Sequence, residues 1–214
     1  MRKMKRVLLA ATIAAAILFL GSCTVWQMFF GPDKNSIDAW WPKDFKTGTR
    51  LSYSYHETYT DPSDNYKEKF TVEITDIDER ETRTVIKTSE DGDIVYLIID
   101  KDKREMVRSG DTIIDDNDEV ILKTPVEEGT TWYNWTNTKY TIDQVKSSKT
   151  VEAGIFDDVV IIKVSDPDWQ TITSVYLYYS VTGGNLGWTQ TYDSSVSYYG
   201  IMENGIELTD IDKP

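Results

Sequence analysis

Alternation of apolar and polar side chains is the strongest pattern in this sequence, and it begins near residue 49. Phe70, Val72 and Ile74 alternate with charged or hydroxyl side chains, and the same two-residue period runs through residues 51–59. Because successive side chains of a β-strand point to opposite faces, this period predicts strands with one buried face. Clusters of turn-forming residues separate these segments at short intervals, which is typical of antiparallel strands.

The strand pattern continues to the end of the chain, and no segment after residue 22 shows the apolar stripe of a helix. Asn204-Gly205 lies between two apolar segments and predicts a hairpin turn, since both residue types tolerate positive φ. We expect an all-β fold in which residues 39–214 form a single domain of curved antiparallel sheet, as a half-barrel, an open barrel or a sandwich. Beyond the segments named above, the expected strands include residues 94–99, 140–145, 159–164, 171–179, 186–192 and 196–202.

The first 22 residues have the composition of a secretory signal peptide. Four basic residues fall within the first six, and residues 7–20 carry no charge. This apolar run is short for a membrane-spanning helix, which needs about 20 residues. The run ends in Leu20-Gly21-Ser22-Cys23, which resembles the lipobox of bacterial lipoproteins. The resemblance implies that an N-terminal signal helix, residues 1–22, is cleaved off and that Cys23 accepts lipid on its thiol.

Cys23 is the only cysteine of the chain. Its lipidation predicts attachment to a membrane through two or three acyl chains, palmitate among them, and leaves no thiol for a disulfide. The protein is then expected in the cell envelope, on the outer side of the inner membrane or on the outer membrane. The next residue is Thr24 and not aspartate, so in a cell with two membranes we expect sorting to the outer membrane.

Residues 23–38 form a membrane-proximal segment between the lipid and the β domain. In place of a polar tether, this segment holds Trp26, Phe29 and Phe30 ahead of a Gly-Pro break. Tryptophan rings settle at the headgroup level of a bilayer, which predicts that these three side chains lie against the membrane. The alternative is that they cap the core of the domain.

The acidic balance of the chain limits its partners. The formal net charge is −13, and loss of the four basic residues of the leader leaves −17. Such a surface repels phosphate backbones, so we expect no nucleic-acid partner. His56 is the only histidine, and with Cys23 lipidated the chain cannot complete a zinc site. We therefore expect no metal and no cofactor.

Tryptophan is the residue type that most favours ligand binding in this sequence. Trp132, Trp135, Trp169 and Trp188 are candidates for a surface that stacks on sugar rings or lines an apolar groove. Trp132 and Trp135 lie three positions apart, so on one strand they face opposite sides and at least one belongs to the core. No catalytic residue is indicated, because an acidic pair is defined by separation in space.

Two segments in the last third of the chain carry a family resemblance. Residues 150–160 read Thr-Val-Glu-Ala-Gly-Ile-Phe-Asp-Asp-Val-Val, and residues 178–188 read Tyr-Tyr-Ser-Val-Thr-Gly-Gly-Asn-Leu-Gly-Trp. They resemble the Val-x-Val-Pro-Ala-Gly-Thr-Phe and Tyr-Tyr-x-Pro-Gly-x-Gly motifs of a group of uncharacterised bacterial envelope lipoproteins, although both prolines are absent here. The resemblance implies a strongly curved sheet, with Phe156 in the core and turns at 153–154 and 183–184. It transfers no catalytic residue.

Together these features predict a membrane-anchored envelope lipoprotein that binds a ligand or a partner and is not an enzyme. The expected ligand is a small hydrophobic molecule or a glycan. One alternative is a carbohydrate-binding module, which requires coplanar exposed tryptophans. Another is a carrier of lipid or another hydrophobic ligand, which requires a closed apolar cavity. A hydrolase would need two acidic side chains about 5 to 10 Å apart across a cleft.

Overall fold

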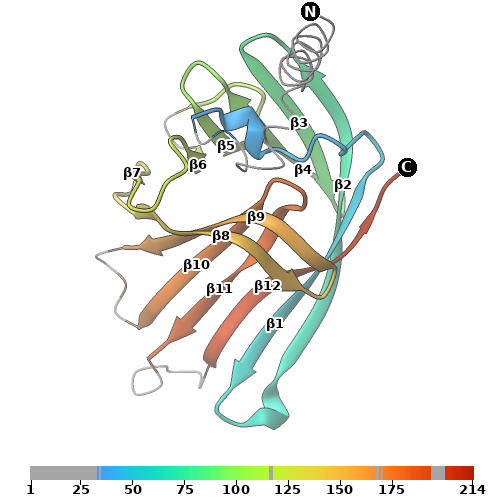
Figure 1. Ribbon diagram of the computed structural model, residues 1–214. Helices are drawn as coiled ribbons and strands as arrows, with labels where there is room; N and C mark the ends of the chain where they lie inside the picture. Colours follow the sequence, from blue (N-terminus) through green and yellow to red (C-terminus); the bar gives the residue numbers. More distant parts are fainter. Residues whose placement is uncertain (1–32, 34, 116–117, 167–168, 170, 194–200) are drawn as a thin grey trace, which may run out of the picture. The chain divides into compact units, whose positions relative to one another are not determined.

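The structure is a computed structural model that describes residues 33, 35–115, 118–166, 169, 171–193 and 201–214 (Figure 1). The expected signal helix, Cys23, and the membrane-proximal Trp26, Phe29 and Phe30 lie outside the described residues, as do positions 196–200 of one expected strand. Within the described ranges, no helix has the length and apolar character needed to span a bilayer. The described residues after Asp33 belong to one compact unit.

The described residues form twelve strands and two short 3₁₀ helices, which agrees with the expected all-β class. All neighbouring strands are antiparallel, in the order β6-β5-β4-β3-β2-β1-β12-β11-β10-β9-β8-β7. The strands are β1 (Arg50–Tyr59), β2 (Tyr66–Glu79), β3 (Arg83–Glu90), β4 (Asp93–Asp100), β5 (Glu105–Ser109), β6 (Glu119–Lys123), β7 (Thr131–Tyr133), β8 (Lys139–Val151), β9 (Gly154–Ser165), β10 (Ile172–Ser180), β11 (Gly184–Tyr192) and β12 (Ile201–Asp212). The helices are η1 (Ile37–Trp40) and η2 (Pro62–Asp64).

The sheet consists of two six-stranded meanders, which we call the first half (β1–β6) and the second half (β7–β12). Within each half every strand pairs with the next one along the chain, and the halves meet where β1 pairs with β12. The outer edges are β6 and β7, which are consecutive in the sequence. The result is a single curved sheet, nearly closed, and of the three expected architectures it is nearest to an open barrel (Figure 1).

Side chains connect the two edges where backbone pairing stops. The indole nitrogen of Trp132 on β7 donates a hydrogen bond to the backbone oxygen of Val120 on β6, at 2.7 Å. The Trp132 ring stacks on Tyr140 with centroids 5.5 Å apart, and the Tyr140 hydroxyl donates to Glu119 of β6 at 3.0 Å. Aromatic stacking and two side-chain hydrogen bonds therefore hold the nearly closed sheet together at its edges.

The inner face of the sheet is filled in part by the segment that precedes β1. Ile37, Trp40, Trp41 and Phe45 are buried within the main hydrophobic cluster, and Trp41 meets Phe45 edge to face with ring centroids 5.6 Å apart. Burial of side chains of this size is the dominant favourable contribution to folding. Ile37, which the sequence assigns to the membrane-proximal segment, is thus part of the core of the β domain.

The hairpin predicted at Asn204-Gly205 is wrong, because both residues lie in the middle of β12. Asn204 pairs with Glu57 of β1 on one side and with Gln190 of β11 on the other. Glycine is needed at position 205 for close approach of strands: a Cβ there would lie 2.5 Å from the backbone oxygen of Trp188. The local turn signal is overridden by pairing with strands distant in sequence.

Candidate functional site

The β8–β9 hairpin is longer than the strands beside it. β8 and β9 have 13 and 12 residues, whereas β10 and β11 have nine each. Pairing between β9 and β10 spans Val159–Val164 on β9, so the first residues of β9 extend beyond β10. Asp158, at this junction, has a φ of +50°, a backbone conformation that L-residues adopt rarely.

The tip of the hairpin crosses to β12. The Ala153 backbone nitrogen donates to the Leu208 carbonyl oxygen at 3.1 Å, and the Glu152 nitrogen donates to the Glu207 carboxylate at 3.0 Å. The turn that joins β10 to β11 packs beneath the hairpin, where a Cβ on Gly183 would lie 2.5 Å from the Phe156 ring. Phe156 is buried, as the family resemblance implied. These contacts hold the hairpin in a fixed position over β10 and β11.

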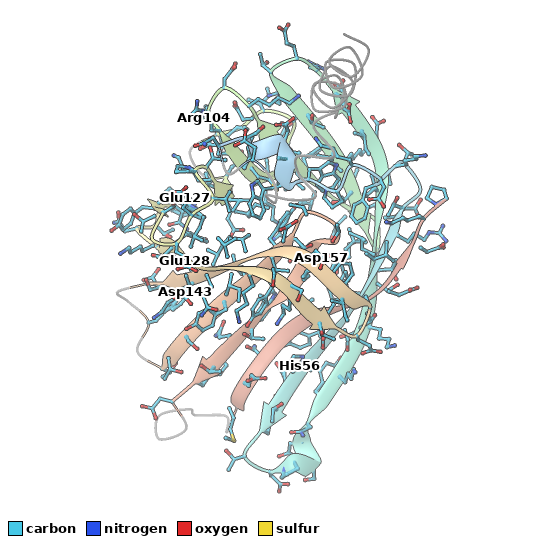
Figure 2. The ribbon with its side chains drawn as sticks, viewed as in Figure 1. His56, Arg104, Glu127, Glu128, Asp143 and Asp157 are labelled. Carbon is cyan, nitrogen blue, oxygen red and sulfur yellow. The ribbon has the colours of Figure 1, made fainter. Side chains whose placement is uncertain are left out.

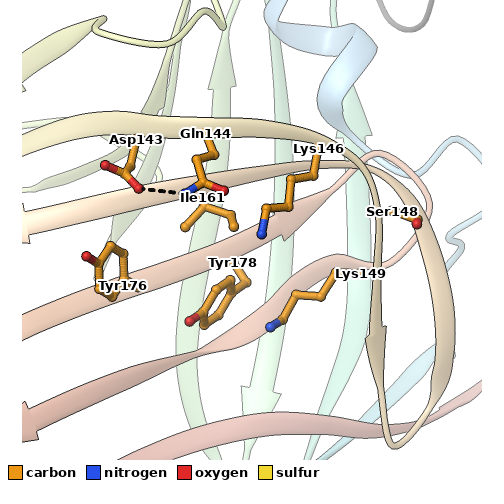
Figure 3. A pocket seen from close by; sticks show the side chains of 8 residues that line it. All are labelled: Asp143, Gln144, Lys146, Ser148, Lys149, Ile161, Tyr176 and Tyr178. Carbon is orange, nitrogen blue, oxygen red and sulfur yellow. Dashed lines mark hydrogen bonds between the residues drawn. The ribbon is translucent and has the colours of Figure 1, made fainter.

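A cavity of about 380 Å³ lies between this hairpin and β10 (Figure 3). We call it the hairpin pocket. A register shift between Ile142 and Gln144 of β8 marks one end of it. Its lining residues are Asp143, Gln144, Lys146, Ser148, Lys149, Ile161, Tyr176 and Tyr178. Ile161 is the one aliphatic side chain among them, so the pocket is mostly polar.

Two lysines give the hairpin pocket its charge. The Lys149 ammonium lies over the Tyr178 ring, 3.8 Å from the centroid, and this contact is a cation–π interaction. Burial lowers the pKa of Lys149, the charge of Glu207 opposes that effect, and the charge of Lys146 adds to it. Among the described residues, neither Lys146 nor Lys149 has a carboxylate partner within the 4.0 Å of an ion pair.

Some of the remaining polar groups of the pocket form hydrogen bonds with each other or with a neighbouring strand. Asp143 accepts a hydrogen bond from the side-chain amide of Gln144 at 3.3 Å. The Tyr178 hydroxyl and the Thr189 hydroxyl of β11 are 3.0 Å apart. Tyr176 and Tyr178 lie two positions apart on β10, so their rings share one face of the sheet. The pocket thus combines two unpaired ammonium groups with two aromatic rings and hydrogen-bonding side chains.

The four tryptophans predicted to form a ligand surface are not brought together. Trp132 is only 5% exposed, whereas Trp135 is 63% exposed in the turn after β7. Trp188 is half-buried on β11, which three strands separate from β7. Trp169 is half-buried and packs against the main hydrophobic cluster. None of the four lines the hairpin pocket.

His56, which is labelled in Figure 2, lies on β1 and has an acidic partner on β12. Its Nε2 lies 3.6 Å from a carboxylate oxygen of Glu203 on β12. Within the described residues, no group of three or more histidine, cysteine or acidic side chains is placed to hold a metal ion.

The residues of the hairpin pocket were missed by sequence analysis. Lys146 and Lys149 lie beyond the strand expected at residues 140–145, because β8 continues to Val151. A weak signal was present in Tyr176 and Tyr178, whose spacing places both rings on one face of an expected strand. Whether the β8–β9 hairpin reaches this face of β10 depends on the length of that hairpin, which the local sequence pattern does not reveal.

Comparison with known proteins gave similarity in fold only. No family model matches the chain, and no curated protein matches it. A Bacteroides fragilis protein described as exported, with a YmcC-like fold, is 11% identical over 81% of this chain and 99% of its own, with a TM-score of 0.49. A Parabacteroides distasonis protein described as a lipoprotein is 13% identical over 81% of this chain and 98% of its own, with a TM-score of 0.41. These similarities assign no role to any residue of the pocket.

Proposed function

We propose that this chain is a lipid-anchored protein of the cell envelope whose β domain binds a small anionic ligand in the hairpin pocket, without catalysis. The observation that carries the proposal is the pair of ammonium groups on Lys146 and Lys149. In a chain with a formal charge of −13, neither lysine has an acidic partner within ion-pair distance among the described residues. A carboxylate or phosphate on a ligand would supply the missing counter-charge.

The shape and lining of the pocket support a ligand of modest size. A volume of about 380 Å³ lies at the lower end of the roughly 300–1,000 Å³ found for small-molecule sites. Tyr176 and Tyr178 offer ring faces and hydroxyls, while Gln144 and Ser148 offer further hydrogen bonds. A purely hydrophobic ligand would displace water from the two ammonium groups without supplying a counter-charge, which is unfavourable. The lining therefore favours a carboxylated or phosphorylated molecule over a lipid tail.

The anchor is proposed from the N-terminal sequence. A leader with four basic residues, an uncharged stretch and the Leu-Gly-Ser-Cys ending supports cleavage and acylation at Cys23. Mass spectrometry of protein extracted from membranes should find an N-terminal peptide that begins at acylated Cys23. In the Cys23→Ser variant we expect the lipid mass to disappear and the protein to keep its leader. An unmodified cysteine in the wild-type protein would contradict the anchor while leaving the ligand proposal intact.

The ligand proposal is tested with the soluble domain and simple anions. Isothermal titration with glucuronate and glucose 6-phosphate should detect binding that weakens with added salt, because the contact is charge-assisted. The double variant Lys146→Met, Lys149→Met keeps the apolar stems and should weaken binding about tenfold or more. Lys69→Met, an exposed lysine on β2, is the matched control and should bind as the wild type does. Equal affinity in the double variant and the control would rule out the pocket as the anion site.

A further inference from the structure

A second group of polar and aromatic side chains lies on the inner face of the sheet, where the two halves meet. Glu57 of β1 pairs with Asn204 of β12, which pairs with Gln190 of β11. Directly opposed residues on antiparallel strands point to the same face, so these three side chains form a row. Tyr53 and Tyr55 of β1 point to the same face as Glu57, because they lie at every second position of the strand. The Tyr53 ring is buried in the core, and Tyr55 lies between it and Glu57. The group, which we call the tyrosine–carboxylate cluster, comprises Tyr55, Glu57, Tyr59, Gln190, Tyr192 and Asn204.

Hydrogen bonds fix the centre of this cluster. The Tyr55 and Tyr59 hydroxyls both donate to the Glu57 carboxylate, the second at 2.5 Å. These bonds lower the pKa of Glu57, so the group is a carboxylate at neutral pH. Burial, followed by the bond to Glu57, raises the pKa of Tyr55 to about 12, so its hydroxyl keeps its proton. The carboxylate and the two rings therefore hold one arrangement without any ligand.

Several hydrogen-bonding positions of the cluster remain unused. Asn204 donates through its side-chain nitrogen to the Tyr55 hydroxyl at 3.5 Å, but its buried side-chain oxygen has no partner among the described residues. Gln190 donates to the Tyr192 hydroxyl at 2.7 Å, so the proton of that hydroxyl is free to point elsewhere. Glu57 accepts two bonds, although a carboxylate has about four acceptor positions. Most of the unused positions are hydrogen-bond acceptors, so the cluster suits a ligand with many hydroxyl donors.

Aromatic rings stand beside these acceptors. Tyr55 meets Tyr66 of β2 edge to face, with ring centroids 6.2 Å apart. Trp188 of β11 pairs with Ile206, which in turn pairs with Tyr55, so the indole lies in the same row as Tyr55. All of these side chains are partly exposed. Flat rings next to fixed acceptors are the two elements that sugar recognition requires: ring faces for the C–H groups and acceptors for the hydroxyls.

We propose that the tyrosine–carboxylate cluster, with Trp188, binds a neutral sugar unit of a glycan. Sugar hydroxyls donate to the Glu57 carboxylate, while the C–H face of the sugar rests on an aromatic ring. Glu57 and the neighbouring Glu68, which accepts from Tyr66 at 2.6 Å, disfavour an acidic sugar. The cluster and the hairpin pocket therefore select opposite classes of ligand, and the cluster does not depend on the pocket being a site.

The test measures neutral and acidic sugars separately on the same domain. In titrations followed by NMR, cellotriose, maltotriose and tri-N-acetylchitotriose serve as neutral probes, and trigalacturonate serves as the acidic probe. We expect at least one neutral probe to bind with Kd below about 10 mM and to shift the indole signal of Trp188. If none of the three neutral probes binds with a Kd below about 10 mM, the proposal is overturned.

Variants locate the binding within the sheet. Glu57→Gln should weaken neutral-sugar binding about fivefold or more, because it removes a charged acceptor, and Asn204→Ala should weaken it because the variant loses the bond that helps to hold the Tyr55 hydroxyl. Glu73→Gln, on β2 outside the cluster, and Lys146→Met, Lys149→Met, in the hairpin pocket, should leave it unchanged. If Glu57→Gln fails to fold by circular dichroism, Asn204→Ala decides the matter. Unchanged affinity in the folded cluster variants, or loss in the pocket variant, would place the sugar elsewhere.

Discussion

The two halves of the sheet have the same topology and both contain register shifts, but they differ in how their hairpins end. In the first half, β3 and β4 have eight residues each and pair in unbroken register, with a tight turn at Asp91-Gly92 where φ is +49° and +95°. In the second half, the β8–β9 hairpin extends beyond β10 and β11 and reaches β12. The hairpin pocket lies beside the long hairpin, and no lining residue comes from the first half.

This difference shows how a plain antiparallel sheet creates a cavity. Strands of matched length bury one face and leave no space between neighbours. A hairpin that is longer than its neighbours must bend over them, and the register shift at Ile142/Gln144 together with the unusual φ of Asp158 permits that bend. We therefore expect the second half to tolerate less change at its irregular positions than the first half does at its turns.

The largest effect is expected where the two halves meet at the sheet edges. Trp132→Ala removes the stacking on Tyr140 and the hydrogen bond to Val120, and should lower the free energy of unfolding by about 4 kcal/mol. Trp135→Ala removes an exposed ring from the adjoining turn and should change it by less than about 0.5 kcal/mol. Urea unfolding followed by circular dichroism measures both. Similar values for the two variants would mean that Trp132 does not connect the halves.

A smaller effect is expected from two glycines with positive φ. In Gly187→Ala, in the second half, the new Cβ would lie 1.8 Å from the Ile206 carbonyl oxygen, and we expect a loss of about 3 kcal/mol. In Gly92→Ala, in the first half, the Cβ meets no atom within 4 Å, so only the backbone strain of about 1 kcal/mol remains. Thermal and urea unfolding of both variants give the comparison. A Gly92 variant as unstable as the Gly187 variant would break the contrast between the halves.

The smallest effects at neutral pH concern two buried tyrosines, one in each half. Tyr53→Phe removes a hydrogen bond to the Asn185 carbonyl and should cost about 1 kcal/mol. Tyr179→Phe should cost almost nothing, because its buried hydroxyl has no partner within the described ranges. Urea titrations at pH 7 distinguish the two variants. A cost for Tyr179→Phe equal to that for Tyr53→Phe would show that its hydroxyl has a partner in solution.

The same two tyrosines predict how stability changes with pH. Burial raises the pKa of both hydroxyls far above the value of about 10 in the unfolded chain. The stabilising contribution is complete below pH 10 and is lost above it, because the unfolded chain then releases protons that the folded chain retains. Each buried tyrosine adds about 1.4 kcal/mol of loss per pH unit, and each phenylalanine variant should remove that share. Unfolding measured from pH 9 to 11.5 tests the sign and the slope.

Strand positions were largely predictable from the sequence. The expected strands at residues 94–99, 140–145, 159–164 and 186–192 all fall within observed strands, because short runs rich in apolar, β-branched and aromatic residues between turn signals favour strands. What the pattern could not supply was pairing between distant strands. The interpretation of Asn204-Gly205 as a hairpin failed for that reason, since β12 is held on both sides by strands that no local signal connects to it.

The candidate sites were much less predictable than the strands. Trp132 was proposed as a ligand contact because tryptophan suits ligand binding, yet its ring and nitrogen are both used in closing the sheet. The lysines of the hairpin pocket carry no motif, and a lysine near a turn is ordinarily solvated. They become notable only when the bend of β8 brings both into the pocket, with Lys149 over the Tyr178 ring. Sites of this kind depend on how far a hairpin reaches, which is a property of the whole fold.

The pairing of β1 with β12 has a consequence for folding of the domain. β12 occupies a central position in the sheet, between β1 and β11. Until it is in place, both of these strands present unpaired backbone groups, which are sites for aggregation with other chains. The pairing joins residues about 150 positions apart, such as Arg50 and Asp212, and contacts of such long sequence separation slow folding. A chain of this topology therefore exposes two strand edges until its most distant contact has formed.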